Sequence, residues 1–327
     1  MRRRDVLQLL AGAALAAPRV AAAQTAAKTY RIGTLTVGPP IPPTAGTGAM
    51  LVAGLAKRGF TLGQNLAYET RGAAGNVSQM ANLMQELKAA DVDVVVTIGY
   101  PSAAAAKASG VATVIATGSG DPVKTGLVAS LARPGGNVTG ISDDAAALST
   151  KRLGLLKAAA PKLRKVAMLW NKDDLGMSQR YDASAQAARD IDVTVIPLGV
   201  RAPDDFNDAF TAMDRDPPDA ILMVTDVLTL LNRKRVFDYA AAHRLPAIYE
   251  QDFMTRDGGL MSYGADAKES FDVAAALAAR IFQGAKPAEL PFEIPTRYLF
   301  VVNLKTAKAI GLEMPPTVLA LADEVIE

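Results

Sequence analysis

Short runs of apolar, mostly β-branched residues alternate along the chain with longer alanine-rich stretches. In the stretch 77–89 the apolar positions include Met80, Leu83, Met84 and Leu87, which is the spacing of an amphipathic helix. The apolar runs predict strands at 30–36, 66–70, 92–98, 111–116 and 138–142, and the stretches between them predict helices at 48–58, 77–89 and 102–108. This alternation is typical of a parallel, doubly wound sheet.

A second series of the same kind follows. Its predicted helices are 150–159, 179–190, 206–213 and 230–243, and its predicted strands are 166–170, 193–197, 220–224 and 247–249. Further elements at 260–263, 266–283, 299–303 and 304–309 exceed what a second lobe needs, so we expect the chain to return to the first lobe and cross back. The sequence therefore predicts an α/β protein with two doubly wound parallel-sheet lobes joined by a multi-strand hinge. Lobe 1 is expected to comprise 28–143 plus 262–290, and lobe 2 to comprise 144–261 plus 291–327.

The composition restricts the chemistry that this chain can perform. The 327 residues include no cysteine and one histidine, His243. Disulfides, thiolate metal sites and a cysteine nucleophile are therefore excluded, and a histidine-clustered metal site is not expected. We expect neither a cofactor nor a bound metal.

The N-terminal residues have the three parts of an export signal. A basic segment at 2–4 precedes an apolar segment at 6–17 and the small residues at 21–23, so cleavage of residues 1–23 is expected. Arg3 and Arg4 also resemble a twin-arginine signal. Removing residues 1–23 takes away four arginines and one aspartate, which changes the formal net charge from +2 to −1. We therefore expect a near-neutral monomer that is located in the periplasm and has no nucleic-acid partner.

Polar and aromatic side chains follow the predicted strands, at the edge of a parallel sheet where ligands bind. Their hydroxyl, amide, carboxylate and aromatic groups suit a small polar molecule held between the lobes. The candidate ligand-binding residues are Thr36, Tyr100, Ser102, Thr117, Ser142, Trp170, Asn171, Thr225, Asp226, Tyr249, Glu250 and Tyr263.

Several of these candidates have an equally plain structural interpretation. Ser102 opens the predicted helix 102–108, where its hydroxyl either receives a ligand carboxylate or caps the helix. Trp170, Tyr249 and the other aromatic candidates either line the cleft or pack in a core. Asp226 and Glu250 either receive an ammonium group or serve as a helix cap or an ion-pair partner.

Signals for catalysis are weak. Gly46 and Gly48 follow the first strand as in a dinucleotide fingerprint, but Leu51 replaces the third glycine. Neither a P-loop nor a G-x-S-x-G nucleophile elbow occurs. His243 lies in the last turn of a predicted helix, where a polar residue is ordinary. A non-enzymatic receptor is favoured, and a secreted α/β enzyme acting on a small molecule is the alternative.

Several motifs recur in an order that identifies a family. They are GDPVKTGLVASLARPGGNVTG at 120–140, KRLGLLK at 151–157, GGLMSYG at 258–264, GAKP at 284–287 and NLKTAK at 303–308. Together they resemble the ABC-transporter substrate-binding proteins, the family that includes tryptophan-binding receptors. The resemblance implies a periplasmic-binding-protein type I fold and delivery of a ligand to an ABC permease in the inner membrane.

The same resemblance implies which ligands and residues to expect. Relatives of this kind bind aromatic amino acids, and Tyr100, Ser102, Thr117 and Ser142 occupy positions that hold the ligand carboxylate. At Trp170 family members usually carry a smaller residue, so the pocket here is expected to differ in shape. An aromatic carboxylate without an amine therefore remains an alternative to an amino acid.

Overall fold

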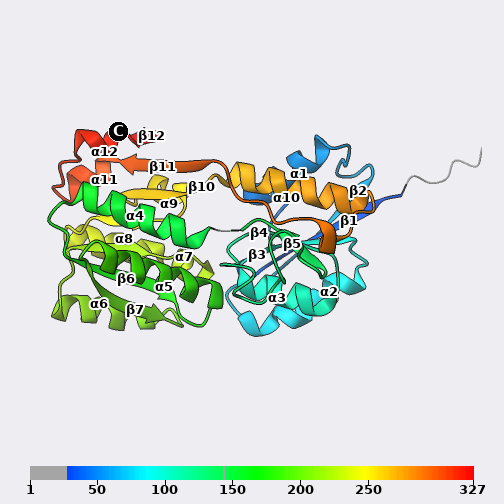
Figure 1. Ribbon diagram of the computed structural model, residues 1–327, viewed down its shortest axis with the longest axis horizontal. Coiled ribbons are helices and arrows are strands. Elements are labelled where there is room, and N and C mark those ends of the chain that lie inside the picture. Colours follow the sequence, from blue (N-terminus) through cyan, green and yellow to red (C-terminus); the bar gives the residue numbers. More distant parts are fainter. Residues whose placement is uncertain (1–27, 143) are drawn as a thin grey trace, which may run out of the picture.

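The computed structural model describes residues 28–142 and 144–327. Each of its two lobes is built on one β-sheet flanked by helices, and the lobes lie side by side along the long axis (Figure 1). The two-lobed α/β fold predicted from the sequence is confirmed. The expected signal segment 1–23 lies outside the described residues. In the described ranges no helix has both the length and the apolar character to cross a membrane.

The smaller lobe contains a five-stranded parallel sheet with the order β2-β1-β3-β4-β5. Its strands are β1 (Tyr30–Thr36), β2 (Leu66–Gly72), β3 (Val94–Ile98), β4 (Thr113–Thr117) and β5 (Val138–Gly140). The connecting elements are α1 (Gly46–Ala56), the 3-10 helix η1 (Val77–Gln79), α2 (Met80–Ala89) and α3 (Tyr100–Ser109). All of these strands lie close to the predicted positions.

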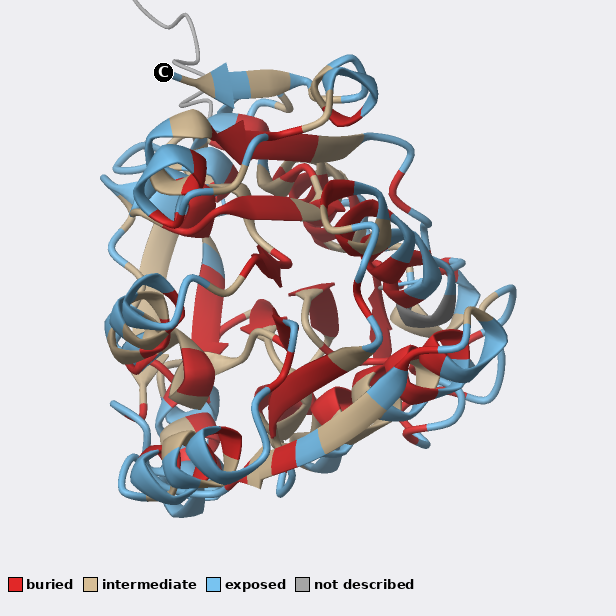
Figure 2. Cartoon of the chain, turned by 90° about the vertical axis from the view of Figure 1, so that its left-hand side faces the viewer, coloured by how far each residue is buried: buried red, intermediate tan, exposed pale blue. Residues whose placement is uncertain are grey.

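Helices cover both faces of this sheet, and the side chains of β3 show why its sequence is mainly apolar. Val94 and Val96 pack in a cluster with Leu51 of α1, whereas Val95 packs on the other face with Leu87 of α2. Successive residues of a strand point to opposite faces, so a strand covered on both sides reads as a nearly continuous apolar run. Buried residues accordingly concentrate in the strands, and exposed residues lie on the outer helices (Figure 2).

The larger lobe contains a seven-stranded sheet with the order β12-β11-β10-β9-β8-β6-β7. Its strands are β6 (Lys165–Asn171), β7 (Thr194–Val200), β8 (Ala220–Met223), β9 (Ala247–Tyr249), β10 (Met261–Ala265), β11 (Tyr298–Asn303) and β12 (Glu324–Ile326). All neighbouring strands are parallel except the antiparallel pair β10–β11. The sequence analysis predicted neither this antiparallel pair nor β12.

The helices of the larger lobe differ from the prediction most clearly between 227 and 242. They are α4 (Ala145–Ala159), α5 (Leu175–Asp190), α6 (Asp205–Arg215), α7 (Val227–Leu231), α8 (Arg233–Ala242), α9 (Asp252–Arg256), α11 (Leu304–Ala309) and α12 (Pro316–Leu319). The single helix expected at 230–243 is divided into α7 and α8 at Asn232. Helix α7 begins earlier than predicted because Asp226 and Thr229 form a capping box there.

The chain passes between the lobes three times, as expected. After β10 it returns to the smaller lobe as α10 (Ala267–Phe282) and the 3-10 helix η2 (Pro287–Glu289), and it then crosses back to β11. Helix α10 lies beside α1 (Figure 1), where Phe271 and Leu277 pack with Ile32 and Leu51. The prediction put residues 262–265 in the smaller lobe, but antiparallel pairing with β11 holds them in the larger sheet.

Residues 291–293 differ from the expected boundary in the opposite direction. The N–H of Glu293 donates to the carbonyl of Gly140 over 2.9 Å, and the N–H of Ser142 donates to the carbonyl of Glu293 over 2.9 Å. These bonds keep the segment beside β5 of the smaller sheet. The third crossing therefore starts after Glu293.

Candidate ligand-binding cleft

The two lobes contact each other at the carboxyl ends of their strands. Val227, at the start of α7, packs against the smaller-lobe cluster that contains Leu35 and Val37. The backbone N–H of Asp121 donates to Oε1 of Gln179 on α5 over 3.1 Å. A Cβ atom added at Gly120 would lie 2.8 Å from the Cα atom of Gly176, so this approach requires glycine. The cleft predicted between the lobes is therefore present, with its walls close together.

A small cavity remains between the lobes, beside the crossing segments. Thr117 and Ser142 of the smaller lobe line it together with Arg152, Arg180 and Glu250 of the larger lobe. Its volume is about 20 Å³, which is room for roughly one water molecule. A molecule the size of an amino acid can therefore enter only when the lobes separate.

Glu250 and two arginines form a buried ion network at the floor of this cavity. Oε1 of Glu250 accepts from Nη1 of Arg152 over 2.8 Å, and Oε2 accepts from Nη1 of Arg180 and from the N–H of Thr225, the latter over 3.0 Å. Nε of Arg152 also donates to the carbonyl of Tyr263 over 2.7 Å. Because both carboxylate oxygens are engaged, Glu250 does not offer the free acceptor for an ammonium group that the sequence analysis considered.

The candidate residues of the smaller lobe fall into two groups. Thr117 and Ser142 line the cavity, as the strand-end rule predicts. Thr36 is buried and its Oγ1 accepts from the N–H of Gly38 over 3.1 Å. Tyr100 packs at the edge of an apolar cluster that contains Phe292.

The predicted capping role of Ser102 is wrong. Helix α3 begins at Tyr100 with Gly99 as its N-cap, so Ser102 lies inside the first turn and does not cap the helix. Its side chain is fully buried, and Oγ lies 3.5 Å from Sδ of Met80. The strand ends at Ile98, as predicted, but the helix starts at Tyr100, earlier than the apolar pattern suggested, because Gly99 adopts a positive φ of 86°.

Two polar candidates of the larger lobe serve the local structure. Asp226 caps α7, and its Oδ2 accepts from Nδ2 of Asn171 over 2.6 Å. Thr225 donates its N–H to Glu250 and places Oγ1 3.5 Å from Sδ of Met254. Asp226 thus takes the capping role that the sequence analysis set beside ammonium binding.

The aromatic candidates of the larger lobe mostly belong to its core. Tyr249 is 1% exposed and meets Phe237 edge-on at 5.0 Å, so it packs in the core and does not line the cavity. Trp170 is buried and stacks on Tyr181 at 3.7 Å between ring centroids. Its indole nitrogen has no hydrogen-bond partner among the described residues. Tyr263 is half-buried, and only its backbone carbonyl contacts the ion network.

Asp174 is a buried carboxylate that the sequence analysis did not single out. It caps α5 by accepting from the N–H groups of Gly176 over 2.9 Å and Met177 over 3.2 Å. Burial first, and the nearby charge of Asp226 second, raise the pKa of Asp174 to about 7. The prediction started this helix at Gln179, so the capping pattern of an aspartate followed by free N–H groups went unused.

The position of His243 gives the enzyme alternative no support. His243 is exposed at the end of α8, stacks on Tyr239 and lies 3.3 Å from Asp214. It is therefore neither buried nor beside a serine of the cleft. Across 28–142 and 144–327, no group of three or more histidine, aspartate or glutamate side chains could hold a metal ion.

Residues 47–326 match the family model described as "ABC transporter substrate binding protein". The chain belongs to this family. This match confirms the resemblance found in the sequence motifs. The family consists of solute receptors, and the chain is called the substrate-binding protein below. No finding supports the alternative of a secreted enzyme.

Two bacterial proteins are similar to this chain. The chain is 25% identical over 263 residues to the "Tyrosine-binding protein" of Clostridioides difficile (strain R20291), covering 80% of this chain and 75% of that protein. It is also 25% identical to an ABC domain from Streptococcus pneumonia in complex with L-Trp, with a TM-score of 0.84 over 91% of this chain and all of that one.

Less similar structures show the fold alone. A conserved domain protein from Vibrio cholerae O1 biovar El Tor superposes with a TM-score of 0.84 at 23% identity, over 91% of this chain and 100% of that chain. A sugar ABC transporter protein from Yersinia enterocolitica has a TM-score of 0.59 at 16% identity, over 88% and 86% of the two chains. The fold is that of a periplasmic-binding-protein type I receptor.

Proposed function

We propose that this substrate-binding protein clamps an aromatic amino acid, or a related aromatic carboxylate, between its lobes and delivers it unchanged to an ABC permease. The protein acts in the periplasm as a monomer, after export through its N-terminal signal. The names of two relatives support this ligand class, since one is described as tyrosine-binding and another as a complex with L-Trp.

The observation that carries the proposal is the cavity shared by the two lobes. Its walls come from strand ends of both sheets, so a molecule bound there touches both lobes and stabilises their contact. The hydroxyls of Thr117 and Ser142 are the groups that we assign to the ligand carboxylate. Three other candidates of the sequence analysis also lie at strand ends: Thr36, Asn171 and Asp226. We propose that they complete the wall of the ligand-binding cavity once the lobes have separated to admit the ligand and closed around it.

The lobe arrangement is consistent with a closed clamp. The TM-score is 0.84 with the L-Trp complex but 0.65 with the ligand-free, open structure of a Clostridium difficile substrate-binding protein, although both comparisons cover 91% of this chain. Because sequence identity is nearly equal, at 25% and 24%, lobe orientation is the natural cause of the difference. We therefore regard the structure as the closed state.

A thermal-shift and calorimetry screen tests the ligand class. L-tyrosine, L-tryptophan and the amine-free 3-indolepropionate are compared with L-alanine and glucose. A ligand at 100 times its Kd is expected to add about 2.7 kcal/mol of stability. Ser142→Ala should weaken binding, whereas Ser130→Ala, on an exposed loop of the same lobe, should not.

Each outcome decides between the hypotheses. Binding of L-tryptophan but not of 3-indolepropionate assigns an amino acid, and the reverse assigns an aromatic acid. Mass spectrometry of the recovered compound tests the absence of chemistry. Binding by none of the aromatic compounds, or conversion of any of them, would refute the proposal.

A further inference from the structure

The contact between Gly120 and Gly176 is a meeting of backbone with backbone across the cleft. Gly120 follows β4 in the smaller lobe, and Gly176 lies in the first turn of α5 in the larger lobe. A Cβ atom added at Gly176 would lie 2.9 Å from the carbonyl carbon of Ser119 and 3.1 Å from the amide nitrogen of Gly120. Carbon atoms pack best at about 3.5–4.0 Å, so the closed lobes leave no room here for a side chain.

The backbone conformation of Gly176 does not itself call for glycine. Gly176 lies within α5 and, unlike Gly120 with its φ of 70°, does not have a positive φ. Alanine favours a helix more than glycine does, so the helix alone would favour alanine at this position. Gly154 on α4 provides the contrast, because it is exposed and a Cβ atom there would meet nothing within 4 Å. The need for glycine at 176 therefore comes from the opposite lobe.

Both sides of this contact are held firmly by their own lobes. In the smaller lobe, the carbonyl of Asp121 accepts from the N–H of Thr125 over 2.9 Å, and Oδ1 of Asp121 accepts from the N–H of Val123 over 2.9 Å. In the larger lobe, Oδ1 of Asp174 accepts from the N–H of Gly176 over 2.9 Å. Neither backbone can therefore move aside without breaking bonds of its own lobe.

Other contacts between the lobes are made by side chains, which can adjust. A Cβ atom added at Gly38 would lie 3.6 Å from a methyl group of Val227, which is an ordinary packing distance. Oε1 of Gln179 accepts from the N–H of Asp121 at the end of a long side chain. Both side chains can follow a small movement of the lobes, whereas the two glycine backbones cannot. The glycine contact consequently sets the closest approach of the lobes.

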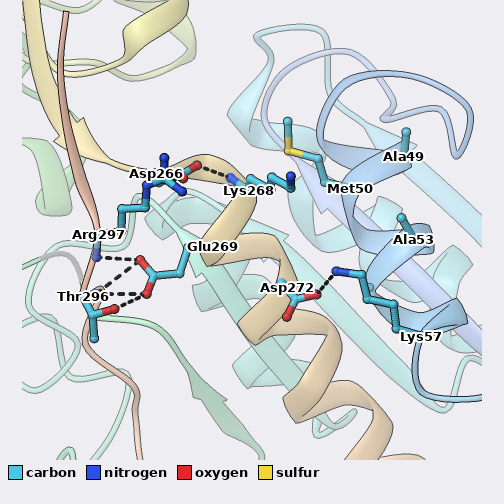
Figure 3. Close-up of a pocket in the computed structure, with 11 residues that line it drawn as sticks. Ala49, Met50, Ala53, Lys57, Asp266, Lys268, Glu269, Asp272, Thr296 and Arg297 are labelled. Carbon is cyan, nitrogen blue, oxygen red and sulfur yellow. Dashed lines mark hydrogen bonds and ion pairs between the residues drawn. The ribbon is translucent and has the colours of Figure 1, made fainter. Parts of the chain in front are cut away.

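The crossing segments form the covalent side of the cleft cavity. Ala265 and Pro295, which belong to two of these segments, line the cavity. Glu269 at the start of α10 accepts from the N–H of Thr296 over 3.2 Å and from the N–H of Arg297 over 2.8 Å (Figure 3). Because the chain is continuous here, the lobes can separate only along their non-covalent contacts.

The glycine contact lies on that non-covalent side, close to the cavity. Thr117 and Arg180 line the cavity from the two lobes. Gly120 comes shortly after Thr117, and Gly176 precedes Arg180 by about one turn of the same helix. A ligand can therefore reach the cavity only after the glycine contact or its neighbours have parted.

We propose that Gly120 and Gly176 form a closing latch, in which the meeting of the two backbones fixes the spacing of the closed lobes and thereby the affinity for the ligand. They are positioning residues, since they act through the spacing of the lobes. A change that holds the backbones apart lowers the population of the closed state, and the apparent affinity falls with it. The inference rests on the clamp of the proposed function but not on the identity of the ligand.

The test measures the spacing of the lobes directly. Because the chain has no cysteine, Ala81→Cys on α2 and Lys234→Cys on α8, both at exposed positions, accept spin labels selectively. Double electron–electron resonance then gives the distribution of distances between the lobes, without ligand and with saturating L-tryptophan. In wild type, L-tryptophan is expected to increase the population at the distance that these positions have in the structure.

Gly176→Ala should lack that population under both conditions, and its Kd for L-tryptophan by calorimetry should rise roughly fivefold or more, as for loss of one bond between the lobes. Its Tm should not fall, because alanine favours the helix. Gly120→Ala approaches the same contact from the smaller lobe and should change the distance in the same way. Gly154→Ala is the matched control, and it should keep the distances and the Kd of wild type.

Gln179→Ala separates the latch from an ordinary attraction between the lobes. It removes the bond to Asp121 but holds no backbone apart, so binding should weaken while L-tryptophan still produces the closed distance. If Gln179→Ala abolishes the closed distance, the hydrogen bond sets the closed state and the latch is overturned.

The remaining outcomes also decide. Identical distance distributions in wild type and Gly176→Ala, with and without L-tryptophan, overturn the latch. An equal change in Gly154→Ala overturns it too, since the effect would then belong to any helical glycine. A wild type that does not respond to L-tryptophan overturns the proposed ligand, and the comparison of ligand-free wild type with Gly176→Ala then decides the latch by itself.

Discussion

Replacement of Glu250 by glutamine should destabilise the larger lobe strongly. The carboxylate is 1% exposed and pairs with Arg152 and Arg180, whose side chains are 5% and 8% exposed. Glutamine keeps the size of the side chain but removes the negative charge that both guanidinium groups share. Breaking a buried ion pair by removing one partner costs about 3–5 kcal/mol, because the remaining charge is left buried without compensation.

Thermal unfolding followed by circular dichroism measures this loss. For a unit of roughly 150–250 residues each kcal/mol lowers Tm by about 2–4 °C, so Glu250→Gln should lower the Tm of the larger lobe by roughly 6–20 °C. The control is Glu86→Gln, since Glu86 pairs with Arg71 over 2.7 Å but is 55% exposed. An exposed pair of this kind contributes about 0–1 kcal/mol.

A particular result would refute this reasoning. If Glu250→Gln unfolds within about 1 kcal/mol of wild type, as expected for an exposed pair, the network adds little stability in spite of its burial. If both glutamine variants lose the same stability, the burial of the charge is not the cause of the loss.

Two further predictions concern the cleft. Burial raises the pKa of Asp174 to about 7 from 3.8, so between these pH values the folded protein holds a proton that the unfolded chain has released, and stability falls as pH rises. Asp174→Asn keeps a capping side chain but does not titrate. Its free energy of unfolding in urea titrations, relative to that of wild type, should therefore increase from pH 4 to pH 7. A constant difference would contradict the shifted pKa. Gln179→Ala removes the bond to Asp121 between the lobes, which costs about 1 kcal/mol and should weaken ligand binding roughly fivefold by calorimetry. Gln186→Ala, an exposed position on the same helix, should bind as wild type does, and equal effects of the two changes would contradict the role of the contact.

Much of the fold could be predicted because of how parallel sheets are buried. A strand such as β3 is covered by helices on both faces, so its apolar run identifies it without knowledge of its neighbours. The antiparallel pairing of β10 with β11 could not be predicted in the same way. It depends on contacts between segments that are separated in sequence by α10, and an apolar pattern does not specify the direction in which two strands pair.

Some residues of the candidate site could likewise be predicted from the sequence, and others could not. Thr117 and Ser142 could be predicted from their positions at strand ends. Tyr249, the last residue of β9, packs in the core, whereas the next residue, Glu250, lies beyond the strand and faces the cavity. The sequence pattern did not reveal which of the two faces the cleft.

Arg152 and Arg180 escaped prediction for another reason. Both lie within helices, where an arginine is usually exposed. Their burial depends on α4 and α5 meeting Glu250, which follows β9 much later in the chain. Arg152 lies in the motif KRLGLLK, whose recurrence in the family was a signal that could have identified it.

The return of α10 to the smaller lobe has a consequence for the biogenesis of the protein. Ribosomes complete residues 28–142 long before Phe271 and Leu277, which cover Ile32 and Leu51, have been synthesised. The larger sheet likewise waits for β11 and β12. Neither half is finished until nearly the whole polypeptide has emerged, so the lobes mature together and a truncated copy would present an aggregation-prone surface.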